Sequence, residues 1–296
     1  MKTRIYVDGR ITAPEDAVIP VLDHGFLLGD SVYEVLWWHA GVLVQEREHM
    51  DRLVESGRRL YMEIEQSSEE LVAAVEETVR AAGVGPDEDA YVRLIVTRGA
   101  GPLGLGFQDI PTRGVVIIVA PANRPDETTW ERGVRMAIVA RRRNPRMALD
   151  PQAKTGNYLN NVLALHEARL AGADDGLMLN EQGEVTEATT ANVYLVHGTS
   201  LVTPPLEAGI LRGTTRTRIL ELCEAAGIPA AEVPVHKDDL FTADEIFVSS
   251  SVRGILPVVK VDEAHISGGK PGALTRRIRR LFETAADEDA ARAVRS

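Results

Sequence analysis

The hydrophobic residues of this chain come in short runs of strand length, which alternate with amphipathic helical segments from one end to the other. Residues 31–38 are rich in strand formers, turn at Ala40-Gly41 and return through residues 42–44, which predicts a hairpin. Residues 67–82 have apolar positions at helical spacing, begin with Ser67 and stop before Gly83. This alternation predicts a mixed α/β or α+β protein.

The remaining segments divide the chain into two domains. Further strands are expected at residues 5–7, 10–11, 91–97, 115–120, 134–140, 176–179, 193–196 and 245–248, and further helices at 48–61, 159–170, 213–226 and 275–284. Residues 99–111 are rich in glycine and are expected to form a loop, and residues 121–126 have the composition of a linker. We therefore predict a small N-terminal α/β domain over residues 1–120, a linker over 121–133 and a larger domain over 134–296.

Composition excludes several classes of function. The net charge of −11 and the pI near 5.2 argue against non-specific binding to nucleic acid or to anionic membranes. No apolar run approaches the roughly 18 residues that a membrane helix needs, and the N-terminus lacks the apolar core of a signal peptide. The single cysteine, Cys223, excludes a disulfide framework. We expect a cytoplasmic enzyme or binding protein that acts on neither nucleic acid nor membranes.

Lysine is rare, since only five of the 33 Lys and Arg residues are lysines. Where any cation suffices the sequence uses Arg, so a lysine is a candidate for chemistry that a guanidinium cannot perform, such as forming a Schiff base or acting as a titratable base. Four of the lysines lie near a terminus, in a turn or near the end of an element: Lys2, Lys237, Lys260 and Lys270. Lys154, two residues before Gly156 and just before an apolar helix, is the unusual one. Taken alone, such a lysine is more often a surface residue, whereas a buried one could form an imine with an aldehyde.

Three further places carry polar groups whose roles are ambiguous when each is taken alone. Glu187 follows a turn, and could be part of a polar loop or a buried carboxylate that holds a proton on a pyridine nitrogen. Gly213-Thr214-Thr215 opens a helix, and could be an ordinary N-terminal cap or a phosphate cradle. Arg52 could be a solvated helix residue or could clamp a phosphate through its planar fork.

The order of these motifs resembles one family. The motifs are Lys154 followed by Asn157-Tyr158-Leu159-Asn160, Glu187 followed by Asn192, Gly213-Thr214-Thr215-Arg216, and Ser249-Ser250-Ser251 before Ile255-Leu256-Pro257-Val258. The sequence resembles the class IV aminotransferases, the fold-type IV pyridoxal-phosphate enzymes, which include branched-chain aminotransferases, D-amino acid aminotransferases and aminodeoxychorismate lyases. The resemblance extends from Gly29 to Val258. It implies a small α/β domain followed by a larger domain of pseudo-barrel character.

The resemblance also implies roles for single residues. Lys154 is expected to form the Schiff base with pyridoxal 5′-phosphate and then to move the proton of the substrate α-carbon. Glu187 pairs with the pyridine nitrogen, Tyr158 with the ring oxygen, and Leu211 packs on the ring face. Four residues take the phosphate: Arg52, Thr214, Thr215 and Ser251. The substrates implied are an amino acid and a 2-oxo acid, and a homodimer is expected because a partner subunit completes the site in this family.

The motifs that select the substrate point in two directions. Tyr91 and Arg93 resemble the Tyr-x-Arg pattern with which branched-chain enzymes bind the substrate α-carboxylate. Residues 104–107 resemble their glycine-rich loop, which closes the pocket of the neighbouring subunit, and Tyr33 is expected in the pocket beside an aliphatic side chain. The short spacing from Lys154 to Tyr158 is instead that of the D-amino acid and lyase relatives.

A turn near the C-terminus also departs from the branched-chain pattern. Val252 and Arg253 stand where small residues are common in a turn that binds the substrate carboxylate, and Arg253 could either add a cation for a dicarboxylate or point to solvent. We expect a transaminase that passes amino groups between a branched-chain or other aliphatic amino acid and a 2-oxo acid such as 2-oxoglutarate. A D-amino acid transaminase is the alternative, and an aminodeoxychorismate lyase is a third.

Other candidate residues are given structural roles. His49 and His166 lie on predicted helices and are expected to be partly exposed. The three arginines at 141–143 are expected to be solvated at a strand end, and Cys223 is expected to be a small core residue. His236 has no second ligand at metal-binding spacing, so no metal site is predicted.

Overall fold

The computed structural model describes residues 1–107 and 110–293. The chain divides into two compact units. The first comprises Met1–Asn123, Ala153–Asn157 and Ala286–Ser296, and the second comprises Arg124–Gln152 and Tyr158–Ala285. The segment that contains Lys154 therefore belongs with the first unit, although the residues on both sides of it in the sequence belong to the second.

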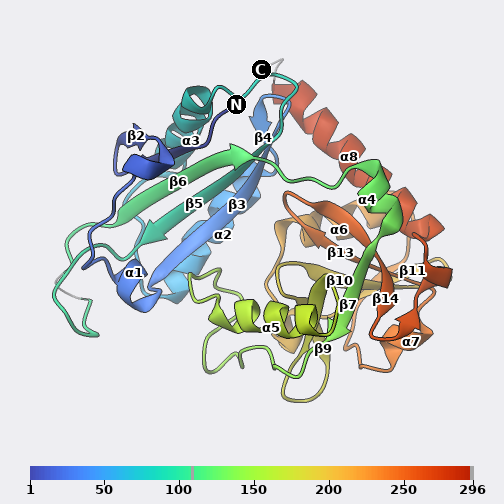
Figure 1. Cartoon of the computed structure of the whole chain (residues 1–296). Coiled ribbons are helices and arrows are strands. Elements are labelled where there is room, and N and C mark those ends of the chain that lie inside the picture. Colours follow the sequence, from blue (N-terminus) through green and yellow to red (C-terminus); the bar gives the residue numbers. More distant parts are fainter. Residues whose placement is uncertain (108–109, 294–296) are drawn as a thin grey trace. The chain divides into compact units, whose positions relative to one another are not determined.

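The first unit is built on a six-stranded antiparallel sheet in the order β2-β1-β6-β5-β3-β4 (Figure 1). Its strands are β1 (Arg4–Val7), β2 (Arg10–Thr12), β3 (Ser31–His39), β4 (Val42–Leu43), β5 (Ala90–Thr97) and β6 (Gly114–Pro121). The turn between β3 and β4 has positive φ at Ala40 (46°) and Gly41 (90°), as a type I′ hairpin requires. The hairpin predicted at this position is confirmed.

Two helices, α2 (Glu46–Arg59) and α3 (Ser68–Ala82), pack on one face of this sheet. Ser67 caps α3 as predicted: its Oγ accepts from the Glu70 amide (3.2 Å), and the Glu70 side chain accepts from the Ser67 amide (2.8 Å). The side chains between sheet and helices form one core, which includes Val32, Leu36, Leu53, Leu71, Val75, Val92, Leu94 and Ile117.

Strand alternation places the candidate substrate residues on the opposite face. On β5, Val92 and Leu94 are buried against the helices, so Tyr91 and Arg93 point to the other face. On β3, the register pairs Tyr33 with Ile95 and Val35 with Arg93, which puts the Tyr33 side chain on the same face as Arg93. The sheet therefore separates a hydrophobic core from a face that carries aromatic and cationic side chains.

The second unit is built on a nine-stranded sheet in which β12-β11-β10-β13-β14-β7-β8-β9 follow one another and β15 pairs with β14. Its strands are β7 (Val134–Ile138), β8 (Asp175–Leu179), β9 (Val185–Ala188), β10 (Asn192–His197), β11 (Ser200–Thr203), β12 (Ala230–Glu232), β13 (Glu245–Ser250), β14 (Gly254–Val261) and β15 (Ala264–His265). Four strands separate β9 from β10 in the sheet, yet only residues 189–191 connect them, so the sheet must curl. This confirms the expected barrel character.

Three further α-helices are long: α5 (Leu159–Leu170), α6 (Thr214–Ala225) and α8 (Ala273–Ala293). Three others among the described residues are short: α1 (His24–Leu28), α4 (Glu127–Arg132) and α7 (Asp239–Thr242). The bounds predicted for α5 are confirmed, whereas α8 is longer at both ends than predicted. Within residues 1–107 and 110–293, no helix is both long and apolar enough to cross a membrane.

Several elements were not predicted from the sequence. The expected linker at residues 121–133 contains helix α4, whose N-terminus is capped by the Asp126 side chain on the Thr129 amide (2.7 Å). Strand β14 lies in the middle of the second sheet although it contains Pro257, a residue that normally argues against a central strand. Helix α1 is only five residues long and depends on Asp23, which accepts from the amides of Gly25 and Phe26.

We predict that Gly99→Ala destabilises the first unit more than Gly41→Ala. Both glycines have φ near 90–100°, which costs a residue with a Cβ on the order of 1–2 kcal/mol. A Cβ at Gly99 would also lie 1.9 Å from the carbonyl oxygen of Thr112, whereas a Cβ at Gly41 meets nothing within 4 Å. Urea unfolding of the two variants, followed by circular dichroism, measures the difference. Equal losses of unfolding free energy would contradict the packing of residues 99 and 112.

Candidate active site

Lys154 is held by backbone pairing to the start of β3. The Tyr33 amide donates to the Lys154 carbonyl (3.0 Å), and the Gly156 amide donates to the Ser31 carbonyl (2.8 Å). The Lys154 amide in turn donates to Oγ of Ser56 on α2 (3.1 Å). These bonds explain why residues 153–157 belong with the first unit, and they fix the backbone of the lysine between a strand and a helix.

The side chains of Lys154 and Arg93 meet at one aromatic ring. The Nζ atom of Lys154 lies 4.5 Å from the centre of the Tyr33 ring, and Cζ of Arg93 lies 3.9 Å from the same centre. The structure thus brings together three of the predicted site residues. Tyr91 lies on the same sheet face as Arg93, and its register partner on the neighbouring strand β3 is Trp37.

Arg52, the predicted phosphate clamp, is part of a buried charge cluster. Its Nε and Nη2 atoms donate to the two carboxylate oxygens of Glu34 (2.7 and 2.6 Å), and Nδ1 of His49 lies 2.7 Å from Glu34 Oε2. Glu34 and His49 are almost completely buried. Burial would raise the pKa of the Glu34 carboxyl, but the charges and hydrogen bonds of Arg52 and His49 outweigh it and lower that pKa to about 2.

The expectation that His49 is partly exposed was wrong, because the structure buries its side chain. Burial lowers its pKa, the Glu34 carboxylate opposes that shift, and the positive charges of Arg52 and Lys154 lower the pKa further. An ionised carboxylate only accepts, so the short contact requires His49 Nδ1–H to donate to Glu34. The burial of His49 could have been inferred from Glu34, a carboxylate that alternates with Val32 and Leu36 on the core-facing side of β3 and therefore requires buried polar partners.

Glu187, the predicted partner of the pyridine nitrogen, is buried on β9 in the second unit. One carboxylate oxygen accepts from Nε of Arg143 (2.9 Å) and the other from the Leu211 amide (3.0 Å). Arg143 is therefore buried and paired, and the expectation that it is solvated was wrong. Neighbouring Arg142 is exposed as expected. A buried carboxylate such as Glu187 is stabilised by a buried cation. The sequence alone does not show which of the three consecutive arginines pairs with it.

The start of α6 has the features of an anion cradle. Thr214 and Thr215 are buried in its first turn, and within residues 1–107 and 110–293 the buried Oγ1 of Thr215 has no hydrogen-bond partner. A Cβ at the capping residue Gly213 would lie 2.1 Å from Oδ1 of Asn192, so glycine is needed for the close approach. Nδ2 of the Asn192 side chain also donates to the Leu211 carbonyl (3.0 Å), which ties this turn to the start of β10. An unsatisfied hydroxyl at a helix N-terminus fits a phosphate.

The turn after β13 is held from two sides. The Val252 carbonyl accepts from Nη1 of Arg124 (2.9 Å). Arg253 donates through Nη2 to the Thr190 hydroxyl (2.7 Å) and lies 3.8 Å from the carboxylate of Asp175, so its side chain is tethered and does not simply point to solvent. Ser251 is half-buried in this turn, while Leu211 and Tyr158 are half-buried next to the starts of α6 and α5.

Comparison with known proteins identifies the family. Residues 31–261 match the family model of the class IV aminotransferases. A putative branched-chain-amino-acid aminotransferase from Methanocaldococcus jannaschii is 36% identical over 280 residues, which cover 95% of each chain. The chain belongs to the class IV aminotransferases.

Two other relatives of this class IV aminotransferase are informative. The D-alanine aminotransferase of Bacillus licheniformis is 31% identical over 291 residues, 98% of this chain and 100% of that protein. The T.th. branched-chain amino acid aminotransferase, solved in complex with N-(5′-phosphopyridoxyl)-L-glutamate, has a TM-score of 0.88 and 28% identity, and the match covers 96% of this chain and 93% of that one. The expected fold class is thereby confirmed.

The Glu34 cluster predicts an acid-dependent loss of stability in this aminotransferase. The folded-state pKa of Glu34, about 2, lies below its ordinary value of 4.5, so its contribution is complete above pH 4.5 and is lost as the pH falls toward 2. Glu34→Gln should lower the unfolding free energy at neutral pH by on the order of 3 kcal/mol, because it leaves Arg52 without its carboxylate. It should also flatten the pH dependence in that window.

Urea unfolding at a series of pH values measures both effects. Glu69→Gln, on the exposed surface of α3, is the matched control and should behave as wild type. If the stability of Glu34→Gln declines with acid as steeply as that of wild type, Glu34 is not the source of the acid-dependent loss of stability.

Proposed function

We propose that this chain is a pyridoxal-phosphate-dependent transaminase that moves an amino group between a branched-chain or other aliphatic amino acid and a 2-oxo acid such as 2-oxoglutarate. The observation that carries the proposal is the shared ring of Tyr33, which brings the Lys154 amine and the Arg93 guanidinium within 4.5 and 3.9 Å of one ring centre. A guanidinium binds a carboxylate well, so Arg93 can hold an amino acid close to the lysine.

The donor set of the chain fits the cofactor. When bound, pyridoxal phosphate supplies an aldehyde for amines and a conjugated ring that accepts electron density. Lys154 would bind the aldehyde, Glu187 would hold a proton on the pyridine nitrogen, Tyr158 would bond the ring oxygen and Leu211 would pack on the ring face. The phosphate would be taken by Arg52, Thr214, Thr215 and Ser251. Support comes from the unsatisfied hydroxyl of Thr215 and from the relative solved with a phosphopyridoxyl compound.

The residues of the chain then have separable tasks. Arg93, with Tyr91 and Tyr33 on the same sheet face, orients the substrate carboxylate. The Nζ atom of Lys154 takes the proton from the α-carbon of the oriented substrate, a transfer that is effectively unimolecular because both groups are held in place. Glu187 stays in position because both of its oxygens accept hydrogen bonds, from Arg143 and the Leu211 amide. The second half-reaction uses the same groups in reverse with a 2-oxo acid.

The turn at Val252 and Arg253 is proposed to contribute to substrate binding mainly through its backbone. The guanidinium of Arg253 is bonded to Thr190 and lies near Asp175, a carboxylate that reduces its attraction for a dicarboxylate. An aliphatic amino acid needs no second cation. This tethering therefore supports an aliphatic amino acid as the donor.

A D-amino acid transaminase is the alternative function. The short spacing between Lys154 and Tyr158 favours it, and the D-alanine aminotransferase of Bacillus licheniformis is among the relatives. The Tyr-x-Arg pattern at Tyr91 and Arg93 favours the branched-chain enzyme, as does the 36% identity to the putative branched-chain-amino-acid aminotransferase from Methanocaldococcus jannaschii.

We also propose that the enzyme works as a homodimer in the cytoplasm. The first unit exposes large apolar side chains close together in the sequence: Val18 (75% exposed), Val21 (71%) and Phe26 (64%). Leu103 and Leu105, in the glycine-rich loop, are also exposed. Exposed apolar side chains of this size favour association, and a second copy of the chain would cover them.

A panel of L- and D-amino acids with 2-oxoglutarate tests the substrate. We expect L-leucine, L-valine and L-isoleucine to be turned over with a kcat/KM well above that of D-alanine or D-glutamate. The reason is the Tyr-x-Arg pattern at Tyr91 and Arg93, which resembles the carboxylate-binding pattern of the branched-chain enzymes. Turnover of the D-amino acids well above L-leucine would favour the alternative, and pyruvate release from aminodeoxychorismate without an amino acceptor would favour a lyase.

A further inference from the structure

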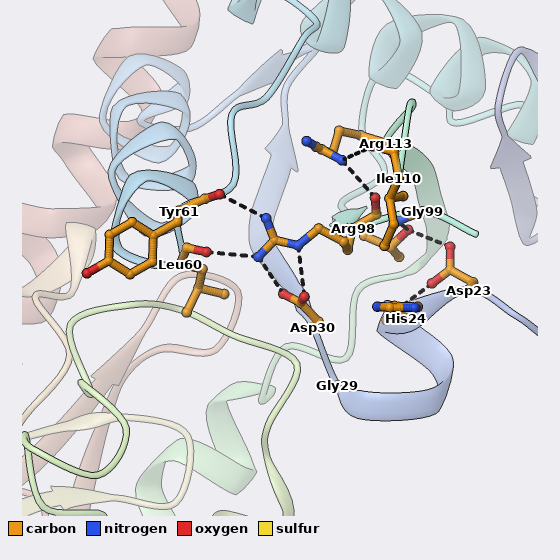
Figure 2. Close-up of polar contacts among 12 residues, drawn as sticks. Asp23, His24, Gly29, Asp30, Leu60, Tyr61, Arg98, Gly99, Ile110 and Arg113 are labelled. Carbon is orange, nitrogen blue, oxygen red and sulfur yellow. Dashed lines mark hydrogen bonds and ion pairs between the residues drawn. The ribbon is translucent and has the colours of Figure 1, made fainter. Parts of the chain in front are cut away.

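Arg98 has no role in the proposed chemistry, yet it is buried and fully engaged. It follows β5 directly and is 2% exposed. Nε and Nη2 donate to the two carboxylate oxygens of Asp30 (2.8 and 3.0 Å), Nη1 donates to the Tyr61 carbonyl (2.9 Å) and Nη2 also to the Leu60 carbonyl (2.8 Å). Figure 2 shows the guanidinium at the centre of these four bonds.

Arg98 and its partners lie at the ends of the three elements that carry the candidate site residues of the first unit. Asp30 precedes β3, which carries Tyr33 and Glu34, and Arg98 itself directly follows β5, which carries Arg93. Leu60 and Tyr61 follow α2, which carries Arg52 and Ser56. One side chain thus holds three element ends together.

The connection to Lys154 runs through α2. Ser56 lies four residues before Leu60, one helical turn away, and its hydroxyl accepts from the Lys154 amide (3.1 Å). A shift of the last turn of α2 would therefore move the hydrogen bond that anchors the lysine backbone. Arg52, one turn further back, would move with it.

We propose that Arg98 is a positioning residue, which fixes the end of α2 against β3 and β5 and thereby sets the position of Lys154. The proposal rests on the proposed function. Only an arginine can make this contact, because a planar guanidinium offers donors to a carboxylate and two carbonyls at once, whereas a lysine ammonium is a point charge on a flexible stem. Its positive charge also suits the carbonyl end of a helix.

The backbone around Arg98 is shaped for this contact. Tyr61 has a φ of 51° although it is not glycine, a strained conformation that turns its carbonyl toward the guanidinium while its ring stays 83% exposed. The Phe107 ring covers the guanidinium, with its centre 4.5 Å from Cζ. Nη1 of Arg113 donates to the Arg98 carbonyl (3.0 Å), which fixes the backbone of Arg98 (Figure 2).

Arg98→Lys, Asp30→Asn and the control Val75→Ala separate positioning from stability. Val75 is fully buried between α3 and the same sheet, so its truncation lowers the melting temperature by a different route. In cofactor-free protein, competitive acetylation with mass spectrometry gives the reactivity of Lys154 relative to the other four lysines, which serve as internal references. Titration with pyridoxal phosphate then gives the dissociation constant.

We expect Arg98→Lys to alter the relative acetylation rate of Lys154 and to raise the dissociation constant for pyridoxal phosphate roughly tenfold or more, since displacements of about 1 Å have effects of this order. Asp30→Asn should act in the same direction and provides the test if Arg98→Lys does not fold. Val75→Ala should change neither quantity at an equal loss of melting temperature.

Arg98→Lys or Asp30→Asn protein that melts earlier but keeps the wild-type Lys154 reactivity and cofactor affinity would overturn the proposal and leave Arg98 with a structural role only. Failure of the proposed function looks different, because wild-type protein would then bind no pyridoxal phosphate. The acetylation of cofactor-free protein tests Arg98 in that case as well.

Discussion

Residues 153–157 pair with the first residues of β3, and this pairing holds Lys154 in the first unit. Two backbone hydrogen bonds, Tyr33 amide to Lys154 carbonyl and Gly156 amide to Ser31 carbonyl, attach a short segment to a strand that lies far earlier in the sequence. A long-range attachment of this kind costs chain entropy and must be stabilised by several contacts at once. The Ser56 hydroxyl on the Lys154 amide and the Tyr33 ring beside the amine supply them.

Buried or half-buried carboxylates paired with arginines recur in both units. Glu34 pairs with Arg52, Asp30 with Arg98 and Glu187 with Arg143, and each arginine is largely buried. Such pairs contribute little net stability compared with apolar packing, but losing one partner leaves an uncompensated buried charge. Their value here is geometric: the planar fork fixes the direction of each carboxylate.

Much of the architecture could be predicted from local signals. The capping pattern at Ser67 and Glu70, the turn at Ala40-Gly41 and the apolar spacing of α5 each depend on residues close in sequence, so the sequence sufficed. Strand β14 could not be recognised because Pro257 opposes a central strand, and its place depends on β13 and β7 on either side. The roles of His49 and Arg143 were also missed, because each is defined by a carboxylate 15 or 44 residues away.

We propose that Lys154 is the residue that binds pyridoxal phosphate. Borohydride reduction of the protein after incubation with the cofactor, followed by peptide mass spectrometry, identifies the modified residue, because the chain has only five lysines. We expect a yellow protein that carries a phosphopyridoxyl group only on the peptide that contains Lys154. A colourless protein that ignores added cofactor, or a label on Lys2, Lys237, Lys260 or Lys270 in its place, would contradict it.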